Sequence, residues 1–241
     1  MEISSIIPMY NEAAIAEDCV RTLASAMEKT GFSCEILFSD DGSTDDCASI
    51  VEKTARELVL TRVDIRVVRA DKNRGKGHAV RLGMQAAQGD LCLFTDCDLA
   101  YGTDIIPAMA NRMKSSDADV LIGSRAIAAD GYAGYTLTRK LASKAYVRLL
   151  AASAGFRYTD SQCGIKLFRR EAAQTIFTRA ETDGWAFDFE LLLLADKFDY
   201  TIEEYPVKVL NHRESKIHLI SDSLKMMKEV RRIKKKLRAK G

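Results

Sequence analysis

Short strand-like segments alternate with helix-length segments through the first hundred residues, and each strand-like segment runs into a polar loop. The strand-like segments are residues 3–8, 34–39, 64–69 and 91–94, and the segments between them are long enough for helices. This alternation predicts one α/β domain built around a mostly parallel sheet. Ligands of such sheets bind beyond the carboxyl ends of the strands, so the polar loops are expected to form one site.

The fourth strand-like segment leads into two aspartates, Asp96 and Asp98. Side chains two residues apart on an extended chain point the same way, so these two carboxylates should converge. Paired carboxylate oxygens suit Mg²⁺ or Mn²⁺, which would in turn hold a diphosphate. A polar exit from a strand would explain a lone Asp-x-Asp equally well. The neighbouring loops therefore decide between the two interpretations.

Those loops carry groups that suit a nucleotide. Asp40 and Asp41 follow the second strand, and their carboxylates can accept hydrogen bonds from a ribose hydroxyl or a base N–H. Arg74 and Lys76 offer cations to phosphate, and the glycines on both sides of Lys76 permit a close approach of the backbone. Turn and helix-cap chemistry would explain each loop separately. The recurrence of such polar groups at three successive strand ends favours a binding site.

Composition excludes several other classes of protein. The 241 residues are 47% hydrophobic and 29% charged, which suits a globular domain with a sizeable core. The six cysteines form neither a Cys-x-x-Cys pair nor a cluster with zinc spacing, so we expect reduced thiols in the cytoplasm. The sequence shows no signal peptide and no apolar run long enough to span a membrane.

The net charge of +2 hides a basic C-terminal segment. Residues 225–240 hold nine Lys or Arg and one Glu, a charge of +8, which leaves about −6 on the remainder. From residue 217 apolar residues recur three or four positions apart, which predicts a basic amphipathic helix over 217–241. The helix could pack on the protein body. We favour an anionic membrane surface, where each basic residue would contribute about 1 kcal/mol. Nucleic acid is disfavoured because no aromatic platform accompanies the charge.

Seven motifs occur in an order that resembles one enzyme family. They are IIPMYNE at 6–12, SDDGSTD at 39–45, NRGKGHA at 73–79, TDCD at 95–98, GSR at 123–125, DSQCGIKLF at 160–168 and WAFDFEL at 185–191. The first four resemble the inverting GT-A glycosyltransferases of family 2, and the last three are similar to polyprenyl-phosphate glucosyl- and mannosyltransferases. The resemblance implies a GT-A domain at 1–216, with a nucleotide-binding half at 1–100 and an acceptor half at 101–216.

The resemblance also implies roles for individual residues. Asp96 and Asp98 would hold Mg²⁺ or Mn²⁺, and Asp188 would act as a general base on an acceptor hydroxyl. Mannosyl members often have Gln where Ala100 stands, so glucose is favoured. The residues expected to bind the two substrates are Pro8, Tyr10, Glu12, Asp40, Asp41, Arg74, Lys76, Arg125, Arg139, Gln162, Arg213, Ser215 and Lys216.

The acceptor decides whether Asp188 must act as a base. A phosphate monoester has its second pKa near 6, so it is largely a dianion at neutral pH and needs little deprotonation. It needs cations to position it, and we expect these to be Arg125, Arg139, Arg213 and Lys216. Arg125 then joins Asp188 as a candidate catalytic residue, and Asp188 would only orient the site.

We therefore predict a metal-dependent inverting glycosyltransferase that moves a hexose to a polyprenyl phosphate. The expected donor is UDP-glucose, with GDP-mannose second, and the expected location is the cytoplasmic face of a membrane. An alternative acceptor is a sugar or glycolipid hydroxyl in cell-surface polysaccharide synthesis. A non-enzymatic alternative is a sugar-nucleotide-binding partner of a membrane-spanning subunit. The intact pair of Asp96 and Asp98 argues against the latter.

Overall fold

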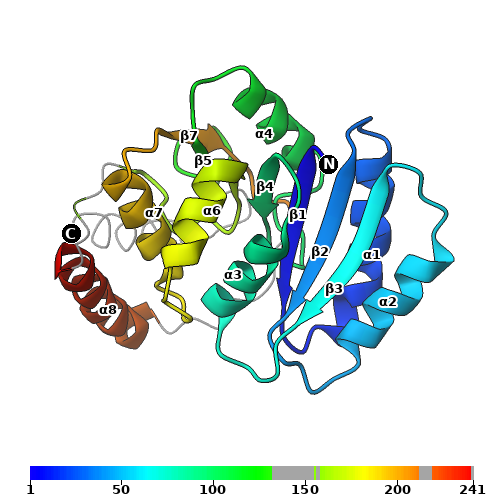
Figure 1. The fold of residues 1–241 in the computed structure, drawn as a ribbon, viewed down its shortest axis with the longest axis horizontal. Coiled ribbons are helices and arrows are strands. Elements are labelled where there is room, and N and C mark those ends of the chain that lie inside the picture. The colour runs from blue at the N-terminus through cyan, green and yellow to red at the C-terminus, as the bar shows by residue number, and fades with distance from the viewer. Residues whose placement is uncertain (132–154, 156–157, 212–218, 240–241) are drawn as a thin grey trace.

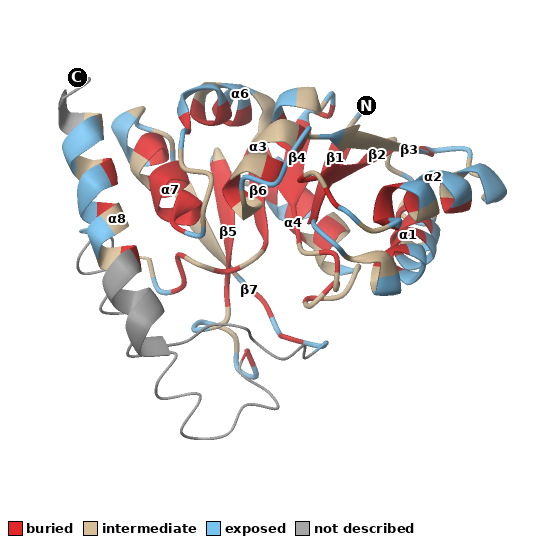
Figure 2. Ribbon diagram, turned by 90° about the horizontal axis from the view of Figure 1, so that it is seen from below, coloured by how far each residue is buried: buried red, intermediate tan, exposed pale blue. Residues whose placement is uncertain are grey.

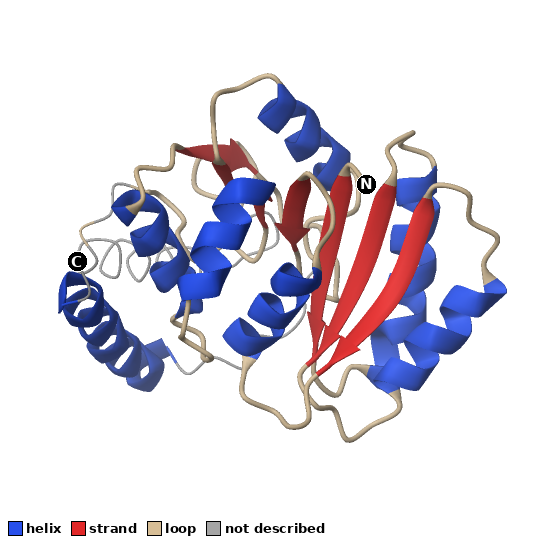
Figure 3. Ribbon diagram, viewed as in Figure 1, coloured by secondary structure: helices blue, strands red, loops and turns tan. Residues whose placement is uncertain are grey.

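The computed structural model of this chain describes residues 1–131, 155, 158–211 and 219–239. Four of the expected substrate-binding residues lie outside the described residues, namely Arg139, Arg213, Ser215 and Lys216. The described part contains seven strands and seven helices. Together they form layers of helices on both faces of a central sheet (Figure 1; Figure 3).

The sheet is mostly parallel, as the alternation of segments predicts. Its strand order is β3-β2-β1-β4-β6-β5-β7. The strands are β1 Ile3–Met9, β2 Cys34–Asp40, β3 Val63–Arg69, β4 Leu91–Phe94, β5 Val120–Ser124, β6 Lys166–Arg169 and β7 Ile202–Pro206. The strand β6, which the sequence did not predict, runs antiparallel to both β4 and β5. The other six strands consequently end at one edge, which we call the carboxyl edge.

Helices cover the two faces of the sheet. They are α1 Ala13–Glu28, α2 Cys47–Glu57, α3 Lys76–Ala86, α4 Ile105–Lys114, α6 Arg170–Arg179, α7 Phe187–Lys197 and α8 Leu219–Ala239. One core cluster joins α1, α2 and α4 to the sheet, and a second joins α3, α6 and α7 to it. This two-sided cover explains why the central strands are almost wholly buried (Figure 2).

The alternation of side chains along each strand decides which core a residue enters. In β4, Leu91 and Leu93 pack in the first cluster, while Cys92 and Phe94 pack in the second. This is the period of two expected of a strand whose faces are both covered. The phenyl rings of Phe94 and Phe168 stack with centroids 6.4 Å apart in the second core. The strand β4 therefore ends at the carboxyl edge on top of a closely packed core.

The C-terminal helix α8 corrects one interpretation of the sequence. Its buried side chains Met226, Val230 and Ile233 form a cluster with Ala186 and Phe189 at the start of α7. The apolar stripe that the sequence assigned to a membrane is thus covered by protein in the described part of α8. Packing on the body prevails because α7 offers a complementary apolar face. No helix among the described residues is long and apolar enough to cross a membrane.

We predict that substitution of Val230 will reveal this packing. Val230 is fully buried, so Val230→Ala should lower the free energy of unfolding in urea by about 2 kcal/mol. The exposed neighbour Arg231 supplies a matched control, and Arg231→Ala should change that value by less than about 0.5 kcal/mol. Equal effects of the two substitutions would contradict a docked α8.

Candidate functional site

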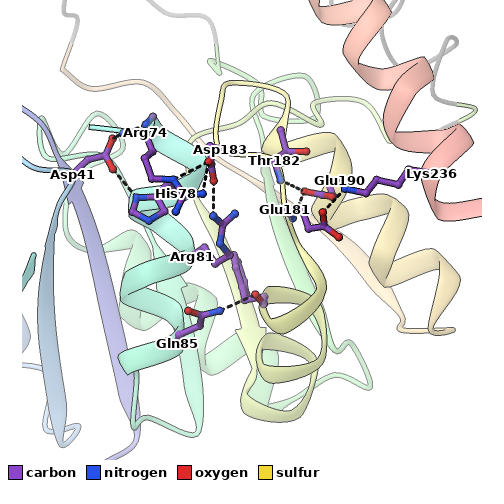
Figure 4. A network of polar contacts seen from close by, with 12 residues as sticks. Asp41, Arg74, His78, Arg81, Gln85, Glu181, Thr182, Asp183, Glu190 and Lys236 are labelled. Carbon is purple, nitrogen blue, oxygen red and sulfur yellow. Dashed lines mark hydrogen bonds and ion pairs between the residues drawn. The ribbon is translucent and has the colours of Figure 1, made fainter. Parts of the chain in front are cut away.

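The carboxylate of Asp41, directly after β2, holds the glycine-rich loop at residues 73–77. Its Oδ2 accepts the backbone N–H of Arg74 at 2.9 Å and of Gly75 at 2.5 Å. Its Oδ1 lies 2.7 Å from His78 Nδ1 (Figure 4). Asp41 is only 1% exposed, and buried backbone N–H groups need acceptors. Asp41 therefore fixes the backbone at the start of α3, and its contact with a nucleoside stays a prediction.

Asp40, the last residue of β2, is fully buried and engaged on both oxygens. Its Oδ1 accepts the backbone N–H of Ser43 at 2.9 Å, and its Oδ2 lies 3.0 Å from Arg69 Nε on β3. The Ser43 hydroxyl oxygen accepts the backbone N–H of Asn11 at 2.9 Å. These contacts tie the loops after β1 and β2 together. A role of Asp40 in binding the donor also stays a prediction.

The end of β1 places three of the expected donor-binding residues. Pro8 is buried within the strand opposite Ser39 of β2. Tyr10 directly follows the strand and is 44% exposed. Glu12 accepts the backbone N–H groups of Ile15 and Ala16 through its carbonyl at the start of α1. Tyr10 therefore presents an accessible ring at the carboxyl edge, which suits stacking on a nucleotide base.

Asp96 and Asp98 lie just beyond β4, as the sequence predicts. Lys76, the first residue of α3, places its Nζ 2.5 Å from Asp96 Oδ1. A Cβ at Gly164 would lie 2.6 Å from Asp96 Oδ2, so a side chain there would shift the Asp96 carboxylate. Asp98 is partly exposed, and its Oδ1 accepts the backbone N–H of Ala100 at 3.1 Å. The carboxylate of Asp96 and the ammonium of Lys76 thus come from different strand–helix units and meet at the carboxyl edge.

The acidic groups at this strand end suit a divalent cation that also binds phosphate. Asp96 and Asp98 supply two carboxylates. Within the described ranges, no group of three Asp, Glu, His or Cys side chains could hold a metal ion. Mg²⁺ in phosphate-transfer sites commonly takes one or two protein carboxylates and completes its shell with water and substrate phosphates. A pair of carboxylates therefore fits a divalent cation that completes its shell with the oxygens of a diphosphate.

A buried ion pair lies beside this strand end. Lys166 of β6 is fully buried, and its Nζ lies 2.5 Å from Asp188 Oδ1 and 2.8 Å from the Cys163 carbonyl oxygen. Burial raises the pKa of the Asp188 carboxyl above its ordinary value, although Lys166 and Lys76 act in the opposite direction. A catalytic role of Asp188 stays a prediction.

A second carboxylate, Asp183 in the loop before α7, also holds the glycine-rich loop. Its Oδ2 accepts a hydrogen bond from Arg74 Nε at 3.0 Å, and its Oδ1 pairs with Arg81 of α3. Its carbonyl accepts the backbone N–H of His78 at 3.3 Å. A Cβ at Gly75 would lie 2.6 Å from that carbonyl oxygen, so the two loops are in close contact. Figure 4 shows Asp183 between these basic side chains.

Glu190 of α7 organises the same loop. Its Oε2 accepts the backbone N–H groups of Glu181 at 2.9 Å and Thr182 at 2.6 Å (Figure 4). Glu190 is 3% exposed, so its role is to anchor backbone groups that would otherwise lack partners. The WAFDFEL motif thus divides its two carboxylates between Asp188, which faces the site, and Glu190, which supports the loop.

Trp185 is the single tryptophan of the chain, and it lies exposed in this loop. Its side chain is 61% exposed, which is unusual for so large an apolar group. The Nζ of Lys76 lies 5.6 Å from the centroid of its ring, within the range of a cation–π contact. The indole therefore borders the same ammonium that contacts Asp96.

Arg125, which the sequence predicts as a cation for the acceptor phosphate, forms an ion pair with a buried carboxylate. Its guanidinium binds the buried Asp160 carboxylate through both oxygens, with Nε 2.6 Å from Oδ2 and the other bond at 2.8 Å. Burial disfavours this charge, but Asp160 outweighs burial and holds the pKa of Arg125 well above its usual value. Gln162 lies partly exposed on the adjoining loop. Binding of an acceptor phosphate by either residue stays a prediction.

Sequence reasoning assigned no role to four residues of the site. His78, Lys166 and Trp185 stand inside the motifs that carry the family resemblance, so their positions were a usable signal. Asp183 stands outside all seven motifs, and its partners Arg74 and Arg81 lie about 100 residues earlier in the chain. Only the packing of the two loops reveals it.

We predict that Asp183 stabilises the protein in a pH-dependent way. Burial raises its pKa, but Arg81 and Arg74 outweigh burial and leave the pKa below its ordinary value. Stabilisation by a depressed carboxyl pKa is complete above the ordinary value of about 3.9 and is lost as the pH falls through the folded value. Asp183→Asn should therefore cost about 1 kcal/mol in urea unfolding at pH 7 and progressively less below about pH 4.

The exposed Asp199 at the end of α7 provides the control for this series. Asp199→Asn should leave the free energy of unfolding unchanged from pH 7 to pH 3. A cost of Asp183→Asn that stays constant over this range would contradict the ion-pair assignment, because a steric defect does not titrate.

Two dolichyl-phosphate beta-glucosyltransferases resemble this chain along nearly its whole length. Dolichyl-phosphate beta-glucosyltransferase of Dictyostelium discoideum is 31% identical over 242 residues, covering 96% of this chain and 73% of that protein. The protein of the same name from Saccharomyces cerevisiae is 33% identical over 242 residues, covering 95% of this chain and 72% of that protein. Similarity of this extent reaches beyond the shared motifs.

Solved structures and a family model agree with these relatives. A structure of glucosyl-3-phosphoglycerate synthase from Mycobacterium tuberculosis with Mn²⁺ and uridine diphosphate matches with a TM-score of 0.67 and 19% identity. The match covers 96% of this chain and 78% of that chain, and it confirms the predicted GT-A fold. The family model for glycosyl transferase family 2 matches residues 4–177. This chain therefore belongs to glycosyl transferase family 2.

Proposed function

We propose that this enzyme transfers glucose from UDP-glucose to a polyprenyl phosphate with inversion at the anomeric carbon. Two relatives more than 30% identical over at least 95% of this chain are named dolichyl-phosphate beta-glucosyltransferases, which supports the sugar and the class of acceptor. The observation that carries the mechanism is the contact of the Lys76 ammonium with the Asp96 carboxylate just beyond β4. Cations there can bind the phosphates of the donor, and carboxylates there can bind a metal ion or orient the acceptor.

In the proposed reaction, a phosphate oxygen of the acceptor attacks the anomeric carbon from the face opposite the leaving diphosphate. Lys76 would place its ammonium against the diphosphate, where negative charge grows as the glycosidic bond breaks. Asp41 and Asp183 keep the backbone that carries Lys76 in place. Asp188, held by Lys166, would orient the acceptor side of the site.

Asp96 and Asp98 would hold a divalent cation, Mg²⁺ or Mn²⁺, together with the donor diphosphate. Such a cation would neutralise part of the charge on the leaving group. Two carboxylates with phosphate oxygens are a donor set that Mg²⁺ prefers, and this supports the proposal. The choice between the two metals is left to measurement.

We predict that Asp188→Asn retains substantial activity if the acceptor is a phosphate. A phosphate monoester is already largely a dianion at pH 7, so loss of a base should lower kcat by less than about tenfold. Loss of a base that deprotonates a hydroxyl typically costs about 10²–10⁴-fold. Asparagine keeps an oxygen that can accept the hydrogen bond from Lys166, but it removes the charge opposite that buried ammonium, so thermal unfolding of the variant is measured alongside. The measurement is glucosyl transfer by the purified full chain to a short polyprenyl phosphate.

Asp199→Asn, an exposed aspartate just beyond the opposite end of α7, is the control for this assay. A decrease of about 10³-fold in Asp188→Asn with unchanged thermal unfolding would instead favour the alternative acceptor, a sugar or glycolipid hydroxyl. An absence of transfer by the wild-type chain with every acceptor would favour the non-enzymatic partner of a membrane subunit. Arg125→Ala is a poor test, since it would leave Asp160 buried and unpaired.

Binding of the donor should be visible in the fluorescence of Trp185. The chain has no other tryptophan, and this indole lies beside Lys76. We predict a saturable change in its emission when UDP-glucose is added with Mg²⁺, and a smaller or no change with GDP-mannose. Trp185→Phe gives the background. A response to GDP-mannose alone would reverse the assignment of the donor.

We place the enzyme on the cytoplasmic face of a membrane as a peripheral protein. The acceptor class is a membrane lipid, and α8 carries exposed basic residues such as Arg231, Arg232 and Lys235. Because the described apolar side of α8 packs on α7, attraction to anionic lipid would come from these charges. A separate membrane-spanning subunit is a further partner compatible with this arrangement.

A further inference from the structure

The ammonium of Lys76 occupies a carboxylate oxygen that a divalent cation would need. Its Nζ lies 2.5 Å from Asp96 Oδ1, and the Lys76 side chain is 18% exposed. Asp98 and Asp188 are the other carboxylates whose charges act on this ammonium. Lys76 therefore contacts one carboxylate directly, and two more add negative charge at this position.

An ammonium and a divalent cation at the same carboxylate disfavour each other. Two positive charges a few ångströms apart in a partly buried site repel each other strongly. A metal that binds Asp96 therefore either binds against the charge of Lys76 or displaces it, and both costs subtract from the affinity of the metal. The ammonium of Lys76 thus competes with the divalent cation for the Asp96 carboxylate.

Lys76 can leave Asp96 without disturbing the fold. Asp41 and the Asp183 carbonyl hold the backbone on both sides of Lys76, at Gly75 and His78. The side chain itself has four flexible methylenes, so its Nζ can move while its Cα stays in place. Phosphate oxygens of a nucleoside diphosphate are the natural new partners for an ammonium released at this position.

We propose that Lys76 is a placeholder cation that makes metal binding depend on the nucleotide. In the free enzyme its ammonium neutralises Asp96 and keeps divalent-cation affinity low. When a nucleoside diphosphate binds, its phosphates take over the ammonium and Asp96 becomes available to the metal. This inference deepens the proposed function, since it rests on a metal–diphosphate donor at Asp96 and Asp98.

The primary test measures binding of Mn²⁺ alone to the full chain by electron paramagnetic resonance. Lys76→Met removes the charge and keeps the length of the side chain, and it should bind Mn²⁺ at least about tenfold more tightly than the wild type. Lys72→Met, an exposed lysine of the same loop, is the matched control and should leave the affinity unchanged. Lys76→Gln serves as a second variant if thermal unfolding shows that Lys76→Met is damaged.

Equal Mn²⁺ affinity in the wild type and both Lys76 variants would overturn the placeholder role. An increase of the same size in Lys72→Met would also overturn it, because the effect would then be a general change in charge. These outcomes leave the proposed transferase intact if the wild type still binds Mn²⁺ together with a nucleoside diphosphate.

A second arm repeats the titrations in the presence of UDP and, separately, of GDP. Coupling between two ligands is reciprocal, so the factor by which the bound nucleotide raises Mn²⁺ affinity should be several-fold larger in the wild type than in Lys76→Met. An identical factor in both proteins would reject the placeholder. If neither protein binds Mn²⁺ with either nucleotide, both this inference and the proposed metal-dependent donor site fail.

Discussion

The site depends on one short loop that is anchored by a residue before it in the chain and by another far after it. The glycine-rich loop at residues 73–77 has backbone N–H groups that must find acceptors when they are buried. Asp41, directly after β2, supplies them, while Asp183, from the loop before α7, pairs with Arg74 and Arg81. The glycines let the two loops approach closely enough for these contacts. This anchoring joins α3 to the loop before α7 and holds the backbone that carries Lys76.

Opposite charges alternate across the resulting site. Lys76 faces Asp96, and the neighbouring Asp188 faces the buried Lys166. Pairs of this kind contribute little net stability, because removing the charges from water costs about as much as their attraction returns. Their value lies in chemistry: a substrate that carries phosphate can exchange partners with charges that are already in position. The same arrangement explains why removal of one member is expected to disturb the other.

The C-terminal helix contributes to the site through packing. Met226, Val230 and Ile233 cover Ala186 and Phe189, which flank Asp188 in the chain. An amphipathic pattern with basic residues describes both a membrane-surface helix and a helix docked on a protein, since both bury one apolar face. The pattern alone could not distinguish the two partners, whereas the apolar start of α7 does.

The sequence by itself determined the parallel α/β layout and the motif residues at the strand ends, because period, turn residues and carboxylate spacing are local properties. Asp96 and Asp98 lie beyond β4, but in a turn closed by the Leu99 N–H on the Asp96 carbonyl, so the alternation of a strand does not set their directions. Tertiary structure alone decided which protein groups these side chains contact. Asp40, Asp41 and Arg125 are engaged by Arg69, by the glycine-rich loop and by Asp160. The antiparallel β6 and the partner of Asp183 also depend on contacts between distant segments. The physical reason is that a charged side chain takes the nearest unsatisfied partner, which only the folded chain brings within reach.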